Sequence, residues 1–337
     1  MPSGWKRVRY RLEWIGLLLA AKLIPLLSRK SCFRLAQMLG ALMSILDRAG
    51  YRVALNNLEV AFGNELSERD RRKIARESFQ HFARTVIDFL WSPNLTRETF
   101  SRYIEFQNFE ETARGTPPER GLIVACCHYS NFEWLSLACG FAGLISTIIG
   151  QEFGNSLLDP IFKTIREQPG HELIPRKRGI VRLYKVLRRN GSTALLVDLT
   201  VRPKQGGVAI DCFGLKKSVP FAHAWLHERT GAPIVPAHCE PLPDGRYRVI
   251  FHRKIDNTAG MTHQQIAQAC WDSFEPYVRR NPAPWLWMYK HWRYQPANST
   301  RTYPFYANFS RRFEEILLRD DGNSVEGTSS AENASFE

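Results

Sequence analysis

The chain has 337 residues and a hydrophobic content of 44%, enough for one large α/β domain, or two small ones, with a sizeable core. Its net charge is +13, although residues 320–337 hold five acidic residues and no basic one. A body this basic favours anionic partners such as nucleic acid or lipid headgroups. No zinc-finger, helix-turn-helix or RNP-like pattern accompanies the charge, which argues against nucleic acid.

The seven cysteines form an odd and scattered set without a Cys-x2-Cys pair. This spacing is not that of a structural zinc site or of a disulfide framework. It predicts reduced thiols in a cytosolic setting and no bound metal.

Residues 1–28 form the first predicted unit. Basic and aromatic residues 5–11 lead into the apolar segment 12–27, which Glu13, Lys22 and Pro25 interrupt. A spanning helix needs about 20 apolar residues, so this segment predicts an interfacial or marginal membrane helix on an anionic surface. The alternative is a buried amphipathic helix of the domain itself.

Residues 29–319 are predicted to form a single domain that opens with a helical layer. Apolar residues recur at helical spacing over residues 30–48 and again over 67–91, which indicates two amphipathic helices with their apolar stripes in the core. Residues 320–337 are polar and acidic, and their composition predicts a disordered tail.

The most informative stretch is an apolar run followed by a histidine. Leu122–Cys127 reads as a buried strand and leads directly to His128, and Ser130 and Asn131 are good caps for a helix that carries Glu133 in its first turn. A carboxylate there can reach the imidazole, orient it and stabilise its protonated form, as a general base requires. The other interpretation is a histidine that only ends a strand, with Glu133 in solvent.

Two further candidates follow later strands. Alternating strands and helices predict a mostly parallel sheet with its site at the carboxyl ends of the strands, where His128, Arg176 and Asp198 all fall. Arg166 lies at the end of the helix that is predicted just before the strand leading to Arg176. A guanidinium stabilises an oxyanion or binds a phosphate, and the pattern leaves open whether Arg166 or Arg176 does so.

Near the end of the chain, residues 285–294 combine tryptophans and tyrosines with basic side chains. Two interpretations stay open. The aromatic residues suit a membrane interface or the rim of an acyl-chain pocket, or they pack the C-terminal part of the chain onto the body.

These motifs, in this order, resemble the lauroyl and myristoyl acyltransferases of lipid A biosynthesis, within the glycerolipid acyltransferase superfamily, and their relatives that acylate mycobacterial mannosides. The similarity covers roughly residues 10–300. It rests on the His-x4-Glu motif of His128 and on segments found on either side of it: Asn56–Gly63, Phe79–Phe89, Leu173–Arg176, Val197–Asp198, Gly207–Gly214, Gly231–Pro236 and Pro284–Arg293.

The resemblance implies a fold with a mostly parallel or mixed sheet flanked by helices. It also implies that the protein is located at the cytoplasmic face of the inner membrane. It implies transfer of a fatty acyl chain from an acyl-carrier protein or coenzyme A thioester to a hydroxyl of a lipid A-type or related glycolipid, without a cofactor. His128 and Glu133 match the catalytic pair. Asp198 matches the acid of a later motif, where Leu199 replaces the family's glutamine, and together with Arg166 or Arg176 it is expected to order the substrate and stabilise charge.

Two alternatives remain at this stage. One is an acyltransferase for another lipid acceptor, a lysophospholipid or an ornithine lipid. The other is a basic peripheral membrane protein that binds anionic lipid and catalyses nothing. The chain contains no Gly-x-Ser-x-Gly elbow, so an enzymatic His128 would activate a hydroxyl of the substrate rather than an enzyme serine.

Overall fold

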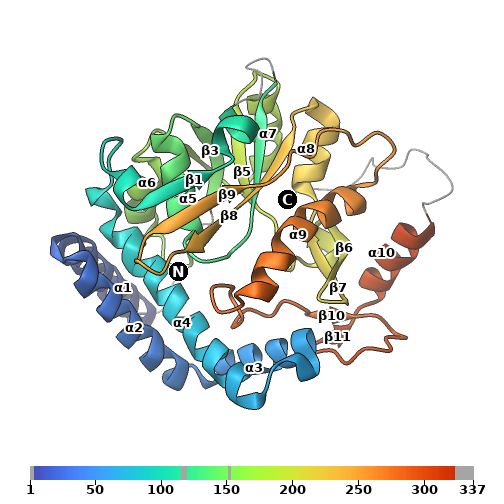
Figure 1. Cartoon of the computed structure of the whole chain (residues 1–337), viewed down its shortest axis with the longest axis horizontal. Helices are drawn as coiled ribbons and strands as arrows, with labels where there is room; N and C mark the ends of the chain where they lie inside the picture. Colours follow the sequence, from blue (N-terminus) through green and yellow to red (C-terminus); the bar gives the residue numbers. More distant parts are fainter. Residues whose placement is uncertain (1–3, 115–119, 151–152, 323–337) are drawn as a thin grey trace.

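A seven-stranded sheet forms the centre of the protein, seen in a computed structural model that describes residues 4–114, 120–150 and 153–322 (Figure 1). The strand order is β1-β9-β8-β2-β5-β3-β4. In chain order the strands are β1 (Ile104–Gln107), β2 (Leu122–Cys126), β3 (Ser146–Gly150), β4 (Glu172–Pro175), β5 (Ser192–Leu196), β8 (Ile234–Pro241) and β9 (Tyr247–Phe251).

The sheet is mostly parallel. Every neighbouring pair runs parallel except β8 and β9, which are antiparallel. Parallel neighbours need long crossover connections, and these are usually helices. The predicted α/β fold with a mostly parallel, mixed sheet is therefore confirmed.

Helices cover both faces of the sheet, which explains why β2 is apolar at every position. Ile123 and Ala125 pack into one buried cluster with α7, α8 and α9, whereas Leu122, Val124 and Cys126 pack into a second cluster with α4, α5 and α6. These helices are α4 (Glu68–Trp91), α5 (Phe132–Phe141), α6 (Asp159–Glu167), α7 (Gly179–Leu187), α8 (Ala222–Thr230) and α9 (His263–Arg280).

Smaller elements complete the C-terminal half. An antiparallel hairpin of β6 (Gly207–Cys212) and β7 (Leu215–Pro220) lies beside α9, and β10 (Tyr294–Gln295) pairs with β11 (Asn308–Phe309). The last helix, α10, spans Arg311–Gly322. Residues 320–322, which were predicted to belong to a disordered tail, form the end of this helix, and residues 323–337 lie outside the described residues.

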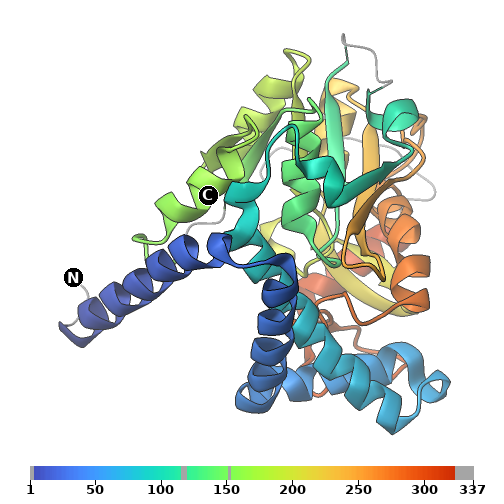
Figure 2. The same cartoon turned by 60° about the vertical axis from the view of Figure 1, so that its left-hand side comes forward.

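The N-terminal helices α1 (Gly4–Leu23), α2 (Arg29–Leu46) and α3 (Arg48–Phe62) lie along the outside of the body (Figures 1 and 2). The structure describes all of α1, and none of its residues is buried. Asn155 fixes α1 to the body by donating to the Tyr10 carbonyl oxygen (2.9 Å) and to the Glu13 carboxylate (3.0 Å). No helix within the described ranges is both long enough and apolar enough to cross a bilayer.

The expectation that both amphipathic helices turn their apolar stripes inward is right for α4 and wrong for α2. Phe79, Ile87 and Leu90 of α4 are buried. The buried side of α2 instead consists of small residues four apart, and its large apolar side chains face outward. The small residues are Cys32, Ala36, Gly40 and Ser44, and the exposed ones are Phe33, Met38, Leu39, Leu42, Met43, Ile45 and Leu46.

The physical reason is the close approach of α2 to α4. A Cβ atom added at Gly40 would lie 2.3 Å from the Cα atom of Gln80, so a large side chain does not fit between the two helices. Small residues let the backbones pack closely, and the large residues are left for the outer face.

Gly40→Val should therefore push α2 away from α4 and lower the free energy of unfolding by about 1–3 kcal/mol, the usual cost of overpacking. The measurement is chemical denaturation followed by circular dichroism. Gly16→Ala in α1 is the matched control, because an added Cβ atom there meets nothing within 4 Å. An equal loss of stability in both variants would contradict the close packing at Gly40.

Candidate active site

His128 lies just beyond the end of β2, in the middle of the sheet. The neighbouring strand β5 pairs with β2 in parallel, so that Cys126 is opposite Leu196. His128 and Asp198 each follow that pair by two residues, and both therefore emerge at the same edge of the sheet. The register alone brings together two residues that are 70 positions apart in the chain.

Asp198 holds the imidazole from one side. Its Oδ1 atom lies 2.7 Å from His128 Nδ1, and its Oδ2 atom accepts a hydrogen bond of 2.9 Å from the indole N–H of Trp285. The Asp198 side chain is fully buried, whereas 14% of the His128 side chain remains exposed. The carboxylate is thus fixed in the interior while the imidazole reaches the surface of the site.

The charge state of the pair follows from these contacts. Burial raises the pKa of the Asp198 carboxyl, but His128, the buried Lys217 ammonium and the Trp285 N–H outweigh it and hold the pKa well below its ordinary value. An ionised Asp198 only accepts hydrogen bonds, so the proton of the neutral imidazole lies on Nδ1 and the lone pair on Nε2. A base nitrogen is therefore left for a substrate.

The turn after His128 is tightly held. Ser130 adopts the left-handed conformation with φ of 52°, which is uncommon for a residue other than glycine. Its N–H donates to the Pro284 carbonyl oxygen (2.9 Å), and its own carbonyl accepts from the Thr85 hydroxyl (3.0 Å). Asn131 caps α5 by accepting the Trp134 backbone N–H, as the sequence predicts.

Behind this turn lies a buried ionic network centred on Asp88 of α4. Its carboxylate pairs with Arg29 of α2 (2.7 Å) and accepts hydrogen bonds from Asn131 (3.1 Å) and from the Tyr247 hydroxyl (2.6 Å). The Arg29 guanidinium lies 4.7 Å from the ring centres of both Trp91 and Trp134. The start of α2 and the start of α5 are thus attached to the same carboxylate.

Glu133 does not occupy the place that the sequence analysis gave it. It forms a two-pronged ion pair with Arg166 of α6, in which Nη2 lies 2.6 Å and Nε 3.1 Å from its two oxygens. Burial lowers the pKa of Arg166, but the charge and hydrogen bonds of Glu133 raise it by more. The pKa is therefore above its ordinary value, and the guanidinium stays ionised. The carboxylate beside His128 is Asp198, and Glu133 orders the arginine.

The two candidate arginines, Arg166 and Arg176, lie in different surroundings. Arg166 is partly buried beside Glu133 and packs against the rings of Phe89 and Phe162. Arg176 follows β4, an edge strand three places from β2, and is exposed. At the usual strand spacing of ~4.8 Å this is about 14 Å from the end of β2. Of the two, Arg166 is the arginine that pairs with Glu133, in the helix that follows His128.

Trp285 is the site residue that sequence reasoning missed. Trp285, Trp287 and Trp292 are all fully buried, so the packing interpretation of the aromatic run is correct. Trp285 also contributes a donor to Asp198, which neither interpretation included. Three tryptophans lie within eight residues in the sequence, but this clustering does not distinguish Trp285 from the two that only pack in the core.

The fold and the site together define an α/β protein in which a histidine, oriented by a buried aspartate, can take a proton from a bound hydroxyl group. A partly buried arginine–glutamate pair joins the next two helices, α5 and α6. Within the described residues, no group of three or more His, Cys, Asp or Glu side chains is arranged to hold a metal ion.

Comparison with known proteins assigns the family. The sequence model described as bacterial lipid A biosynthesis acyltransferase matches residues 4–294, and the chain belongs to this family. It is also 28% identical, over 192 residues, to the phosphatidylinositol mannoside acyltransferases of two Mycobacterium tuberculosis strains, CDC 1551 / Oshkosh and H37Rv. The match covers 54% of this chain and 57% of each relative, so it spans little more than half their length.

A double-mutant cycle tests the observed pairing. Glu133→Gln and Arg166→Met should each lower the free energy of unfolding, and the double variant should lose about 1–3 kcal/mol less than the sum, because each single change leaves one partly buried charge unpaired. The measurement is urea denaturation. The matched cycle of Glu133→Gln with His128→Gln should be additive within about 0.5 kcal/mol; coupling there instead would support the original assignment of Glu133.

Proposed function

We propose that this protein transfers a fatty acyl chain from an acyl thioester, carried by acyl-carrier protein or coenzyme A, to a hydroxyl group of a lipid A-type or related glycolipid. The observation that carries the proposal is the pair of His128 and the fully buried, ionised Asp198 in a chain of this acyltransferase family. The mycobacterial relatives, named for acylating a mannoside of phosphatidylinositol, support a glycolipid acceptor.

The proposed chemistry needs one proton transfer in each direction. His128 Nε2 takes the proton of the acceptor hydroxyl as its oxygen attacks the thioester carbonyl carbon. The C–O bond forms, the tetrahedral oxyanion collapses and the C–S bond breaks. The imidazolium then returns the proton to the departing thiolate, while Asp198 stays ionised and stabilises the imidazolium. A thioester is already activated, so the balance of atoms and charge requires no cofactor.

Arg166 is the proposed partner for negative charge. A guanidinium has five N–H donors, and Glu133 accepts from two of its nitrogen atoms. The remaining donors suit the oxyanion of the tetrahedral intermediate or a phosphate of the substrate. Glu133 then acts by fixing the guanidinium, and the exposed Arg176 has a weaker case for a place in the site.

The apolar surroundings support a lipid substrate. Leu196, the last residue of the central strand β5, is 40% exposed although it lies two residues before the buried Asp198. It pairs with Cys126 in the register next to His128. An exposed large apolar side chain is costly in water, and contact with an acyl chain at this end of the strand would relieve that cost.

The outer surface of α1 and α2 supports attachment to a membrane. Most of the exposed large apolar side chains of the described chain lie on these helices, among them Trp5, Leu12, Leu19, Met38 and Ile45. Exposed basic residues of α1 accompany them, including Arg7 and Arg11. An apolar face with basic flanks binds the interface of an anionic bilayer. We therefore infer a peripheral position at the cytoplasmic face of the inner membrane.

The first test is acyl transfer by wild type and His128→Ala. Purified protein in detergent or vesicles receives a labelled acyl-carrier-protein or coenzyme A thioester and total lipid from the source cells. A new labelled lipid should form with the wild type and fall by roughly a hundred- to ten-thousand-fold in the variant, because a general base is lost. Its mass identifies the acceptor and separates a glycolipid from a lysophospholipid or an ornithine lipid.

Vesicle binding is the control in that experiment, since His128→Ala leaves α1 and α2 intact. A folded wild-type protein that binds vesicles but transfers from neither donor would contradict the proposed reaction and favour a lipid-binding protein without catalysis.

The membrane surface has its own test. Met38→Glu/Ile45→Glu should weaken co-sedimentation with vesicles of phosphatidylethanolamine and phosphatidylglycerol by at least about tenfold, because two apolar side chains leave the interface. Leu318→Glu is the matched control, since Leu318 is 66% exposed but lies on α10, away from α1 and α2 (Figure 1). Equal weakening by both variants would contradict docking through α2.

A further inference from the structure

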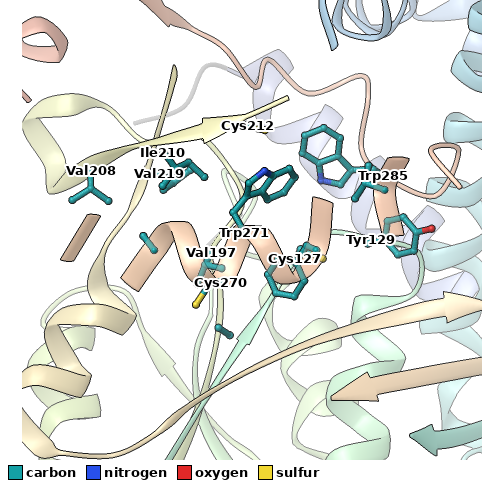
Figure 3. Close-up of a cluster of buried hydrophobic side chains, with 14 of the residues drawn as sticks. Cys127, Tyr129, Val197, Val208, Ile210, Cys212, Val219, Cys270, Trp271 and Trp285 are labelled. Atoms are coloured by element: carbon teal, nitrogen blue, oxygen red, sulfur yellow. The ribbon is translucent and has the colours of Figure 1, made fainter. Parts of the chain in front are cut away.

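Lys217 of β7 is a fully buried lysine next to the candidate active site. Its Nζ atom lies 3.0 Å from His291 Nδ1 and faces the rings of Trp285 and Trp271, at 5.0 and 5.5 Å from their centres. Figure 3 shows the two tryptophans side by side. Burying a cation is costly unless a compensating charge or hydrogen bonds balance it. Burial lowers the pKa of the Lys217 ammonium, and the charge of Asp198 is among the interactions that oppose this lowering.

His291 does not supply the compensating charge. Its Nε2 atom lies 2.9 Å from the Leu286 carbonyl oxygen, which can only accept, so the ring proton lies on Nε2 and Nδ1 accepts from Lys217. Burial and the neighbouring Lys217 hold the pKa of His291 well below its usual value. The imidazole is therefore neutral, and it fixes the position of the ammonium without cancelling its charge.

Trp285 connects this pair to Asp198. Its indole ring stacks on His291 with 3.8 Å between ring centres and an interplanar angle of 17°, and its N–H donates to Asp198 Oδ2. A cation over an indole face draws electron density from the ring, which makes the N–H a stronger donor. Lys217 thus contacts the indole ring whose N–H binds Asp198, and its charge lowers the pKa of that carboxyl.

We propose that Lys217 is a positioning residue of this active site, whose ammonium, held by His291 and acting across Trp285, keeps Asp198 ionised and fixed against His128. The expected effect of Lys217 on the reaction rate rests on the proposed acyl transfer, whereas its coupling to Asp198 does not. Lys217 and Asp198 form a compensated pair of buried charges without direct contact. The carboxylate can then stay ionised in the interior and stabilise the imidazolium as it forms.

The experiment combines Lys217→Met with Asp198→Asn. In the wild-type background Lys217→Met should lower Tm, because the buried carboxylate loses its counter-charge. In the Asp198→Asn background the same change should leave Tm unchanged or raise it, because an uncompensated buried cation is removed. Lys217→Gln, which keeps a hydrogen-bond donor for His291 but no charge, should behave like Lys217→Met and replaces it throughout if the methionine variant does not fold.

Kinetics provide the second measurement. Lys217→Met should lower kcat roughly tenfold, because the Asp198 carboxylate and the imidazolium lose electrostatic support, and leave KM for the acyl donor unchanged because Lys217 is buried. In Asp198→Asn it should cause no further loss. Lys216→Met is the matched control, since Lys216 is the neighbouring residue and its ammonium pairs with Asp211 at the surface (3.1 Å).

A purely structural Lys217 would give an equal loss of Tm and of kcat in both backgrounds, and that result would overturn the proposal. The Tm cycle requires no turnover. If the wild type transfers no acyl group, the proposed function fails while the coupling between Lys217 and Asp198 is still decided.

Discussion

The parallel pairing of β2 with β5 is the constraint on which the site depends. Parallel neighbours end at the same edge of a sheet, and this register places His128 and Asp198 equally far beyond their last paired residues. The rest of the architecture serves that geometry. Helices cover both faces of the sheet, and the indole N–H of Trp285 binds one oxygen of the Asp198 carboxylate, so that the other oxygen remains for the imidazole.

Sequence reasoning predicted the fold well wherever the signal was local. The strand before His128, the cap at Asn131 and the alternation of strands with helices all follow from short patterns, and the structure confirms them. The residue that binds the imidazole of His128 could not be predicted from a local pattern. Glu133 is near in sequence and Asp198 is distant, and only strand adjacency brings Asp198 to Nδ1. Strand order cannot be obtained from one chain's periodicity.

Helix α2 illustrates a second limit. Helical spacing identifies an apolar face, but it does not say whether that face meets protein or lipid. The opposite stripe of Cys32, Ala36, Gly40 and Ser44 carried the missing information, because small residues four apart allow two helix backbones to approach closely. Hydrophobicity alone predicted that the large apolar side chains of α2 lie in the core. The buried side consists instead of the residues that are small enough to fit between α2 and α4. The buried lysine escaped notice for a related reason, since Lys216 and Lys217 look alike in sequence.

The Asp88 network has a geometric consequence for the lipid substrate. Arg29 at the start of α2 and Asn131 at the start of α5 share one buried carboxylate, so α2 cannot tilt without disturbing the turn that carries His128. With α1 and α2 resting on a bilayer, as proposed, His128 stands at a fixed height above the headgroups. On that proposal, the height of His128 would determine which hydroxyl groups of a lipid it can reach, namely those that protrude from the bilayer by that distance.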